Sequence, residues 1–338
     1  FEADFQPVSY GFRPARRAQD AIEEIRYYAH RGYERVLEGD IRACFDEIDH
    51  VALLDRMRCR LKDKRVLALV KSFLKAGILT ELGQNTDTHS GTPQGGILSP
   101  LLANIALTAL DEHFRARWDE HKGGSDRLRH RQRGGATYRL VRYADDFVVL
   151  VNGDQRHLDQ ARTEVAAVLA TVGLALSPEK TRSCSIDEGF DFLGFHIQRH
   201  TQKGSARQFV YSYPSKTALK AIRWKVKQLT KGVTHQTADQ LFDRLNRMLR
   251  GWSQYFRHGS SSAAYHNLQN YTWWRIWHWL RKKHPRTPGR TIISRYYNGW
   301  TPEYNGVQLY SPTTMTIERY RYRGTRIITP WNKPATAP

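Results

Sequence analysis

The chain has 338 residues, with 53 Lys and Arg, 33 Asp and Glu, and a formal net charge of +20 at pH 7. This length allows two or three domains with sizeable cores, and three scattered cysteines exclude a disulfide scaffold and a cysteine-rich zinc module. No apolar run approaches the roughly 20 residues that cross a bilayer, so we expect no membrane segment.

The first 200 residues alternate between strand-like and helix-like hydrophobic periodicity. In chain order the patterns predict a strand at 36–41, helices at 53–61 and 67–74, a helix at 99–114, a loop at 119–137, a β-hairpin at 138–151, a helix at 158–172 and a strand at 191–197. Ser99 is expected to cap its helix with Pro100 in the first turn, and Gly173 to end the next helix. These patterns predict an α+β domain over residues 1–200.

The composition changes near residue 200. Residues 1–200 hold 29 basic and 29 acidic residues, whereas residues 201–338 hold 24 basic residues, four acidic ones and eight of the nine tryptophans. Helical spacing predicts helices at 219–229, 241–252 and 261–283, and Thr237 with Gln240 offers the second a capping box. Basic charge interleaved with aromatics is typical of a nucleic-acid-binding surface, and the alternative is a basic domain whose tryptophans are core.

Three acidic residues lie where an uncompensated charge is costly. Asp40 closes an apolar strand, and Asp145 and Asp146 occupy the turn of a hairpin with apolar arms. Carboxylates brought together repel each other, and two divalent cations about 3.5–4 Å apart resolve that repulsion. Such a pair of ions activates a 3′-hydroxyl and stabilises a leaving pyrophosphate. The alternative is that these acids pair with Arg42 and Arg142.

Longer motifs point to one family. They are Ser9–Pro14 (SYGFRP), residues 90–105 (SGTPQGGILSPLLANI), Tyr143–Asp146 (YADD), residues 173–181, Phe192–Phe195 (FLGF), and Arg250–Trp252 followed by Tyr255–Phe256. In this order they resemble the fingers, palm and thumb motifs of bacterial-type group II intron-encoded reverse transcriptases/maturases. The resemblance implies a right-hand polymerase, with fingers and an antiparallel-sheet palm at 1–200. A basic helical thumb (maturase domain X) follows at 201–300, and a C-terminal tail at 301–338.

The resemblance assigns roles in a polymerase site. Asp40, Asp145 and Asp146 would be catalytic and, with the backbone carbonyl of Ile41, would hold two Mg²⁺ ions, for which Mn²⁺ is a substitute. A second set would contact the incoming dNTP: Arg13 on the triphosphate, Phe45 as the gate against a 2′-hydroxyl, Gln94, Gly95, and Lys180 near the leaving pyrophosphate. A third set would grip the primer end: Phe192, Leu193, Gly194 and Phe195.

Ordinary structural interpretations of the same residues stay open. Phe45 and residues 192–195 suit plain core packing, and Gly95 suits a turn without a ligand. Lys180 suits a solvated helix end. Arg13 suits a salt bridge to one of three acids, Asp20, Glu23 or Glu24.

The basic thumb is expected to bind RNA largely through phosphates and shape. The candidate contacts are Arg223, Lys225, Lys227, Arg247, Arg250, Arg281, Lys282 and Lys283. The expected partners are group II intron RNA, an RNA template with its DNA primer, dNTPs and target DNA. A dimer is not predicted.

Two departures from the family pattern affect these expectations. The family's N-terminal extension and first fingers motif are not found, and the chain opens on Phe1. We therefore expect residues to precede Phe1 and part of the fingers to be missing from this chain. No His-Asn-His-type nuclease with its cysteine pairs is found either, so we expect no DNA endonuclease activity. The expected location is the bacterial cytoplasm.

The leading hypothesis is an RNA-directed DNA polymerase, a nucleotidyltransferase that also binds its intron RNA. Such a protein would assist splicing and support intron mobility by target-primed reverse transcription. One alternative is an RNA-binding splicing cofactor with little polymerase activity, which would not need all three aspartates. Another is a domesticated or defence-associated reverse transcriptase, for example one linked to CRISPR, which the maturase-like thumb disfavours.

Overall fold

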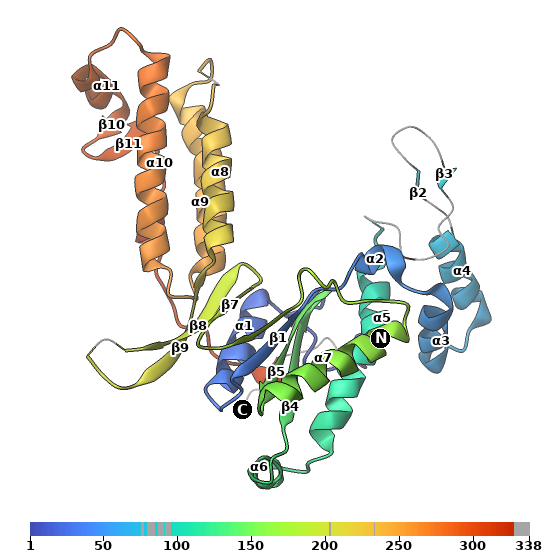
Figure 1. Cartoon of the computed structure of the whole chain (residues 1–338). Coiled ribbons are helices and arrows are strands. Elements are labelled where there is room, and N and C mark those ends of the chain that lie inside the picture. Colours follow the sequence, from blue (N-terminus) through green and yellow to red (C-terminus); the bar gives the residue numbers. More distant parts are fainter. Residues whose placement is uncertain are drawn as a thin grey trace, which may run out of the picture. The chain divides into compact units, whose positions relative to one another are not determined.

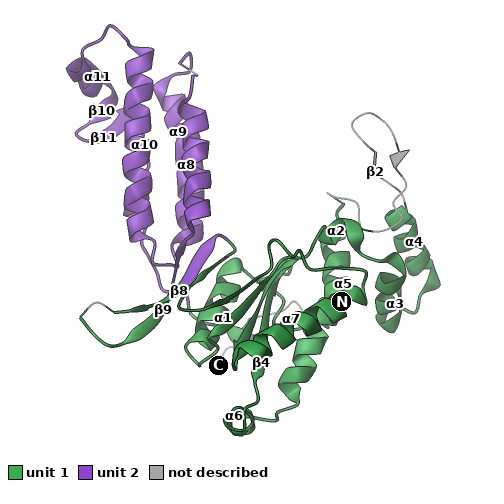
Figure 2. Ribbon diagram, viewed as in Figure 1, with its two compact units in different colours: residues 1–193, 198–210, 321–338 green, residues 194–197, 211–320 purple. Residues whose placement is uncertain are grey.

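The computed structural model of this chain describes residues 1–75, 78–79, 85–86, 91, 96–202, 204–232 and 234–327. Contacts within the chain divide it into two compact units, which Figure 2 shows in different colours. Unit 1 comprises residues 1–193, 198–210 and 321–338, and unit 2 comprises residues 194–197 and 211–320. The segment 301–338 is therefore divided between the two units.

A four-stranded antiparallel sheet forms the centre of unit 1, in the strand order β4-β5-β1-β6 (Figure 1). Its strands are β1 (Arg35–Gly39), β4 (Thr137–Tyr143), β5 (Asp146–Asn152) and β6 (Arg182–Ser185). The hairpin predicted at 138–151 is confirmed as β4 and β5. All five residues from Phe147 to Val151 are fully buried. This explains why β5 is a continuous apolar run without alternation.

The helices of unit 1 are α1 (Ala18–Ala29), α2 (Cys44–Glu47), α3 (His50–Arg60), α4 (Lys64–Lys75), α5 (Ser99–Asp119), α6 (Gly124–Gln132) and α7 (Gln155–Ala170), with the short strands β2 (Ile78–Leu79) and β3 (Asn85–Thr86) after α4. Of these helices, α1, α5 and α7 lie against the sheet (Figure 1). Apolar residues of α3, α5 and α7 share one core with Leu37, Leu140 and Val149 of the sheet. The helices predicted at 53–61, 67–74 and 158–172 are confirmed to within a few residues.

Three local predictions are wrong. The loop predicted at 119–137 contains α6, which buries no side chain and therefore shows no hydrophobic period. Ser99 is the first residue of α5 rather than its cap, because Leu98 holds the cap position. The strand predicted at 191–197 is two strands, β7 (Phe190–Phe192) and β8 (Phe195–Thr201). Leu193 and Gly194 both adopt positive φ between them, at 49° and 78°.

Unit 2 is mainly helical. After β9 (Gln208–Pro214), it contains α8 (Lys216–Thr230), α9 (Ala238–Phe256), α10 (Ser262–Lys283), α11 (Gly289–Tyr296), the short strands β10 (Tyr297–Asn298), β11 (Thr301–Tyr304) and β12 (Val307–Gln308), and the 3₁₀ turn η1 (Pro312–Thr314). The three predicted helices are confirmed, and the capping box of Thr237 and Gln240 is present. Leucines of α9 form a core with Leu268, Ile276 and Trp279 of α10.

The tryptophans of unit 2 divide between core and surface. Trp279 is buried, whereas Trp224, Trp274 and Trp300 are 59%, 56% and 82% exposed. The core interpretation therefore holds for Trp279, whereas the exposed tryptophans leave the nucleic-acid-binding surface as a prediction. Within the residues that the structure describes, no helix combines the length and apolar character needed to cross a membrane.

Candidate functional site

The pairing of β1 with β5 brings two of the predicted catalytic acids to one edge of the sheet. The strands are antiparallel, with Gly39 opposite Phe147. Continuing this register by one residue places Asp40 opposite Asp146, although the two are 106 positions apart in the chain. The carboxylate of Asp40 is half-buried there.

The hairpin between β4 and β5 turns through two residues. Tyr143 pairs with Asp146, which leaves Ala144 and Asp145 as the turn. Ala144 has a φ of 59°, in the left-handed region that residues other than glycine rarely adopt. A backbone conformation of this kind persists where surrounding contacts hold it, and it is common at functional sites.

Arg142 supplies such contacts from beneath the turn. Its guanidinium is fully buried and donates to both carboxylate oxygens of Asp111, over 2.8 and 2.5 Å. The remaining nitrogen donates to Asn104 Oδ1 over 2.8 Å and to the backbone carbonyl of Ala144 over 3.0 Å. Buried charges need such complete pairing, and the last bond ties the network directly to the turn.

The N-terminal motif Ser9–Pro14 contacts the turn through Gly11. Asn104 donates to the carbonyl of Gly11 over 3.0 Å. A Cβ atom added to Gly11 would lie 2.3 Å from the backbone nitrogen of Ala144. Only glycine allows the two backbones to approach this closely. The predicted alternative, in which Arg42 and Arg142 pair with the three aspartates, is wrong, because Arg42 pairs with Glu47 and Arg142 with Asp111.

The three aspartates influence one another electrostatically. Desolvation of the carboxylate raises the pKa of Asp146 to about 6, and the nearby charges of Asp145 and Asp40 add to the shift. The charge of Lys180 opposes it. Lys180 Nζ lies 3.3 Å from Asp40 Oδ2. The cation therefore offsets part of the repulsion between the carboxylates.

The sequence analysis missed Glu38, a fourth acid on this face. Burial raises its pKa to about 7, and the charges of Asp191, Asp146 and Asp40 add to the shift, against Arg182. Glu38 lies two residues before Asp40, and side chains two apart in a strand share one face of a sheet. That period was the signal that could have found it.

We expect Glu38 to make the protein less stable as the pH rises from about 4.5 to about 7 in the absence of divalent cations. Because its folded-state pKa is raised from 4.5 to about 7, the folded chain binds more protons than the unfolded chain in this window. Linkage then makes the free energy of unfolding fall as the pH rises. Thermal midpoints measured in EDTA across this window should fall less steeply for Glu38→Gln than for the parent. Equal slopes would contradict the assignment.

The donor set fits hard divalent cations. Carboxylate and carbonyl oxygens are the ligands of Mg²⁺ and Mn²⁺. Desolvation and the charges of Asp145 and Asp40 both raise the pKa of Asp146, and a cation would relieve the second of these effects. In the described part of the chain, however, no three His, Cys, Asp or Glu side chains converge closely enough to hold an ion. Asp40 is ion-paired with Lys180 in this arrangement.

The structure also describes the predicted metal ligand Ile41 and the predicted nucleotide contact Phe45. Ile41 is buried and bridges to Leu176, directly after Asp40. Phe45 lies on α2, half-buried against the main core of unit 1. Gln94 and Gly95 lie outside the described residues.

Arg13 does not have the geometry of a triphosphate clamp. Its side chain is 1% exposed and pairs with Glu2. Its remaining donors go to the backbone carbonyls of Glu2, Phe5, Gln6 and Ser9. The predicted salt bridge to Asp20, Glu23 or Glu24 is also wrong, since Glu2 is its partner. Arg13 therefore holds the N-terminal segment together.

The predicted primer-grip residues form the turn between β7 and β8. Phe192 and Phe195 are buried, and Leu193 and Gly194 are the two positive-φ residues between them. The division between the two units falls inside this turn. Within unit 2, Phe195 packs against Tyr255 and Phe256.

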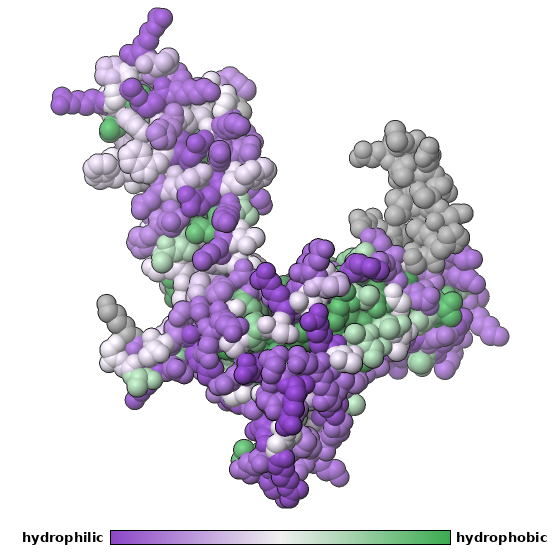
Figure 3. All heavy atoms as spheres, viewed as in Figure 1, coloured by the Kyte–Doolittle hydropathy of each residue, from purple (hydrophilic) through white to green (hydrophobic). Residues whose placement is uncertain are grey.

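The predicted RNA contacts lie on the helices of unit 2, whose face in view is largely hydrophilic (Figure 3). Six of the eight are exposed: Lys225, Lys227, Arg247, Arg250, Arg281 and Lys282. Lys283 uses two of its ammonium hydrogens within the chain, because it donates to the carbonyls of Thr234 and Gln236. Arg223 is half-buried, with its guanidinium 4.4 Å from the ring centre of Tyr271.

Comparison with known proteins gives two family matches along the chain. Residues 2–197 match the family described as reverse transcriptase (RNA-dependent DNA polymerase). Residues 219–297 match the group II intron, maturase-specific domain. The two matches fall on the α+β part and the helical part of the chain.

This chain matches only part of the length of its individual relatives. The chain is 33% identical over 252 residues to Protein YkfC of Escherichia coli, which covers 67% of this chain and 66% of that protein. It is 32% identical over 243 residues to the group II intron-encoded protein LtrA of Lactococcus lactis, covering 59% of this chain and 40% of that protein. Telomerase from Candida albicans aligns with a TM-score of 0.46 and 13% identity over 86% of this chain and 54% of that one.

Proposed function

The chain belongs to the reverse transcriptase (RNA-dependent DNA polymerase) family, and from this premise we propose that it extends a DNA primer on an RNA template. The observation that supports the proposal is the pairing of Gly39 with Phe147, which by one further residue brings Asp40 next to the turn of Asp145 and Asp146. Arg142, paired with the buried Asp111, holds that turn by donating to the carbonyl of Ala144.

Asp40, Asp145 and Asp146, with the carbonyl of Ile41, would hold divalent cations, of which Mg²⁺ is the first candidate. When bound, the ions supply the Lewis acidity that activates the primer 3′-hydroxyl and stabilises the pyrophosphate. The side chain of Lys180 is 72% exposed and ion-paired with Asp40. Its exposure would let it move to the leaving pyrophosphate and donate a hydrogen bond or a proton there.

Phe45 and the 90–105 motif would shape the nucleotide pocket. A half-buried ring anchored in the core is rigid enough to exclude a 2′-hydroxyl by contact, which favours dNTPs over rNTPs. Gln94 and Gly95 would contact the base and sugar of the same nucleotide. The turn of Phe192, Leu193, Gly194 and Phe195 would hold the primer end.

Unit 2 would bind RNA. The match to the maturase-specific domain and the exposed basic side chains support binding to a group II intron RNA, assistance in its splicing and intron mobility on target DNA. Arg247 and Arg250 line an open groove of about 770 Å³ with Asn246 and Tyr310. Guanidinium groups beside polar and aromatic side chains suit a phosphate backbone with unstacked bases.

Binding of structured RNA by this chain should depend steeply on salt. If about eight phosphates are neutralised, log K should fall with log salt at a slope of about −6 to −7. Arg247→Ala with Arg250→Ala should make the slope shallower by about 1 to 2, because two phosphate contacts are lost. Filter binding over a range of salt measures this, with Arg162→Ala, an exposed arginine of α7, as the matched control. An unchanged slope in the double variant would remove the groove from the RNA interface.

Primer extension on an RNA template with dNTPs and Mg²⁺ tests the polymerase proposal. We expect extension that EDTA abolishes and that rNTPs do not support. The second candidate function, a splicing cofactor with little polymerase activity, is favoured by the maturase-domain match. Tight, salt-sensitive RNA binding without any extension would establish it and reject the polymerase.

A further inference from the structure

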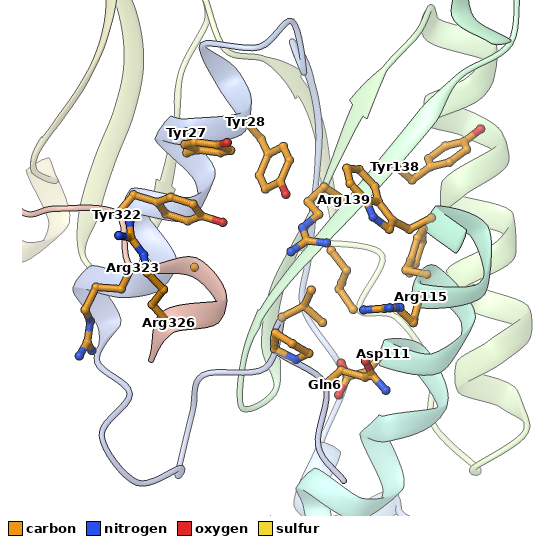
Figure 4. Close-up of a pocket in the computed structure, with 16 residues that line it drawn as sticks. Gln6, Tyr27, Tyr28, Asp111, Arg115, Tyr138, Arg139, Tyr322, Arg323 and Arg326 are labelled. Atoms are coloured by element: carbon orange, nitrogen blue, oxygen red, sulfur yellow. The ribbon is translucent and has the colours of Figure 1, made fainter. Parts of the chain in front are cut away.

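A cavity of about 350 Å³ lies in unit 1, away from the three aspartates. Strand β4 lines it with Tyr138, Arg139 and Leu140, and α1, α5 and the segments 6–8 and 322–326 complete it (Figure 4). Arg139 precedes Tyr143 by four strand residues, which span about 13 Å at about 3.3 Å each. The cavity is therefore a separate site.

The lining of the cavity combines guanidinium groups with aromatic rings. Figure 4 shows Arg115 and Arg139 directed toward the same space as the hydroxyl groups of Tyr28 and Tyr322. Arg139 lies 4.9 Å from the ring centre of Tyr28 and 5.1 Å from that of Trp118. The one lining carboxylate, Asp111, is already paired on both oxygens with Arg142. Two further guanidinium groups of the lining are neutralised, because Arg139 pairs with the buried Glu24 and Arg323 with the buried Asp20. Arg115 is exposed and pairs with Asp119 through Nε, so its terminal nitrogens can also bind an anion that carries a flat ring.

The C-terminal segment closes the cavity. Arg323 donates to both carboxylate oxygens of the buried Asp20, over 2.7 and 2.6 Å, and to the carbonyl of Ala15. Tyr322 stacks on Tyr27, with ring centres 4.1 Å apart and planes inclined by 18°. Residues some 300 positions apart thus form one wall, fixed by a buried ion pair and a ring stack.

We propose that this cavity binds one nucleotide, with its base against the Tyr322 ring and its phosphate on Arg115. The volume lies within the range of small-ligand pockets, about 300–1,000 Å³. Base–aromatic stacking is insensitive to the identity of the base, so the site is expected to prefer nucleotides as a class. The ligand is either a free mononucleotide or a nucleotide unstacked from a bound RNA strand.

Equilibrium dialysis of radiolabelled AMP, GMP, CMP and UMP against the full chain in EDTA tests the proposal. EDTA keeps the aspartate site free of metal, so polymerase failure and pocket failure stay distinguishable. We expect saturable binding that weakens about tenfold in Tyr322→Ala and in Arg115→Ala. Tyr322→Phe should bind like the parent, because it keeps the ring. Arg129→Ala, which removes an exposed helical arginine that is likewise paired with an aspartate, is the matched control.

A second arm separates the two sources of the nucleotide. Ultraviolet crosslinking of a 4-thiouridine-labelled RNA, followed by peptide mapping, should mark Tyr322 if the ligand comes from bound RNA. Mononucleotide binding without this crosslink assigns the site to a free nucleotide. The proposal is overturned if neither probe binds, or if binding is the same in Tyr322→Ala and Arg115→Ala as in the parent.

Discussion

Asp145→Ala is expected to lower the rate of RNA-templated primer extension by about a thousandfold, since several kcal/mol of transition-state stabilisation depends on the bound ions. Asp145 is one of the two residues of the hairpin turn and lies near Asp40 and Asp146. Its carboxylate would hold an ion, and alanine has no ligand to replace it. Single-turnover extension on an RNA template measures the loss.

RNA binding should survive this substitution, because the predicted RNA contacts lie in unit 2. Asp159→Ala, which removes an exposed carboxylate from α7, is the matched control and should extend primers like the parent. Filter binding of the same template checks that Asp145→Ala still binds RNA. Extension at the parental rate by Asp145→Ala would reject the aspartate site.

Asp111→Ala is expected to lower the free energy of unfolding by about 3–5 kcal/mol, because it leaves the charge of Arg142 buried without its partner. Both side chains of this pair are 0% exposed. The variant should also lose primer extension, since Arg142 holds the carbonyl of Ala144 at the turn. Urea unfolding followed by circular dichroism measures the first effect.

An exposed ion pair provides the comparison. Asp55 and Arg58 are paired with side chains 60% and 56% exposed, so Asp55→Ala should cost at most about 1 kcal/mol. Asp111→Leu with Arg142→Met, which removes both charges, should recover much of the lost stability without restoring extension. A loss for Asp111→Ala as small as that for Asp55→Ala would show that the buried network does not support the fold.

Local patterns were sufficient for most of the elements. The helix α7 and the three long helices of unit 2 each show their period within one short stretch of chain, and β5 stands out as a short apolar run next to the turn. The motif order was likewise visible without any structure, and it led to the family that the match over residues 2–197 confirms. The helix α6 was not predicted, because it is largely polar and buries no side chain, so its sequence shows no hydrophobic period.

The candidate site depended on contacts that no local pattern records. Asp40 was recognised as an acid at a strand end, but only the pairing of β1 with β5 places it opposite Asp146. Arg13 has the chemistry of a phosphate ligand, and only the folded N-terminal segment shows its donors occupied.

By itself, the sequence determined the periodic elements, the charge asymmetry and the ordered motifs, because these depend on residues close together in the chain. The tertiary structure decided which partner each charged group takes, as in the choice of Asp111 by Arg142 and of Asp20 by Arg323. Those choices join residues 31 and 303 positions apart. They are set by which groups become buried together, and a buried charge must find its partner wherever the fold has brought one.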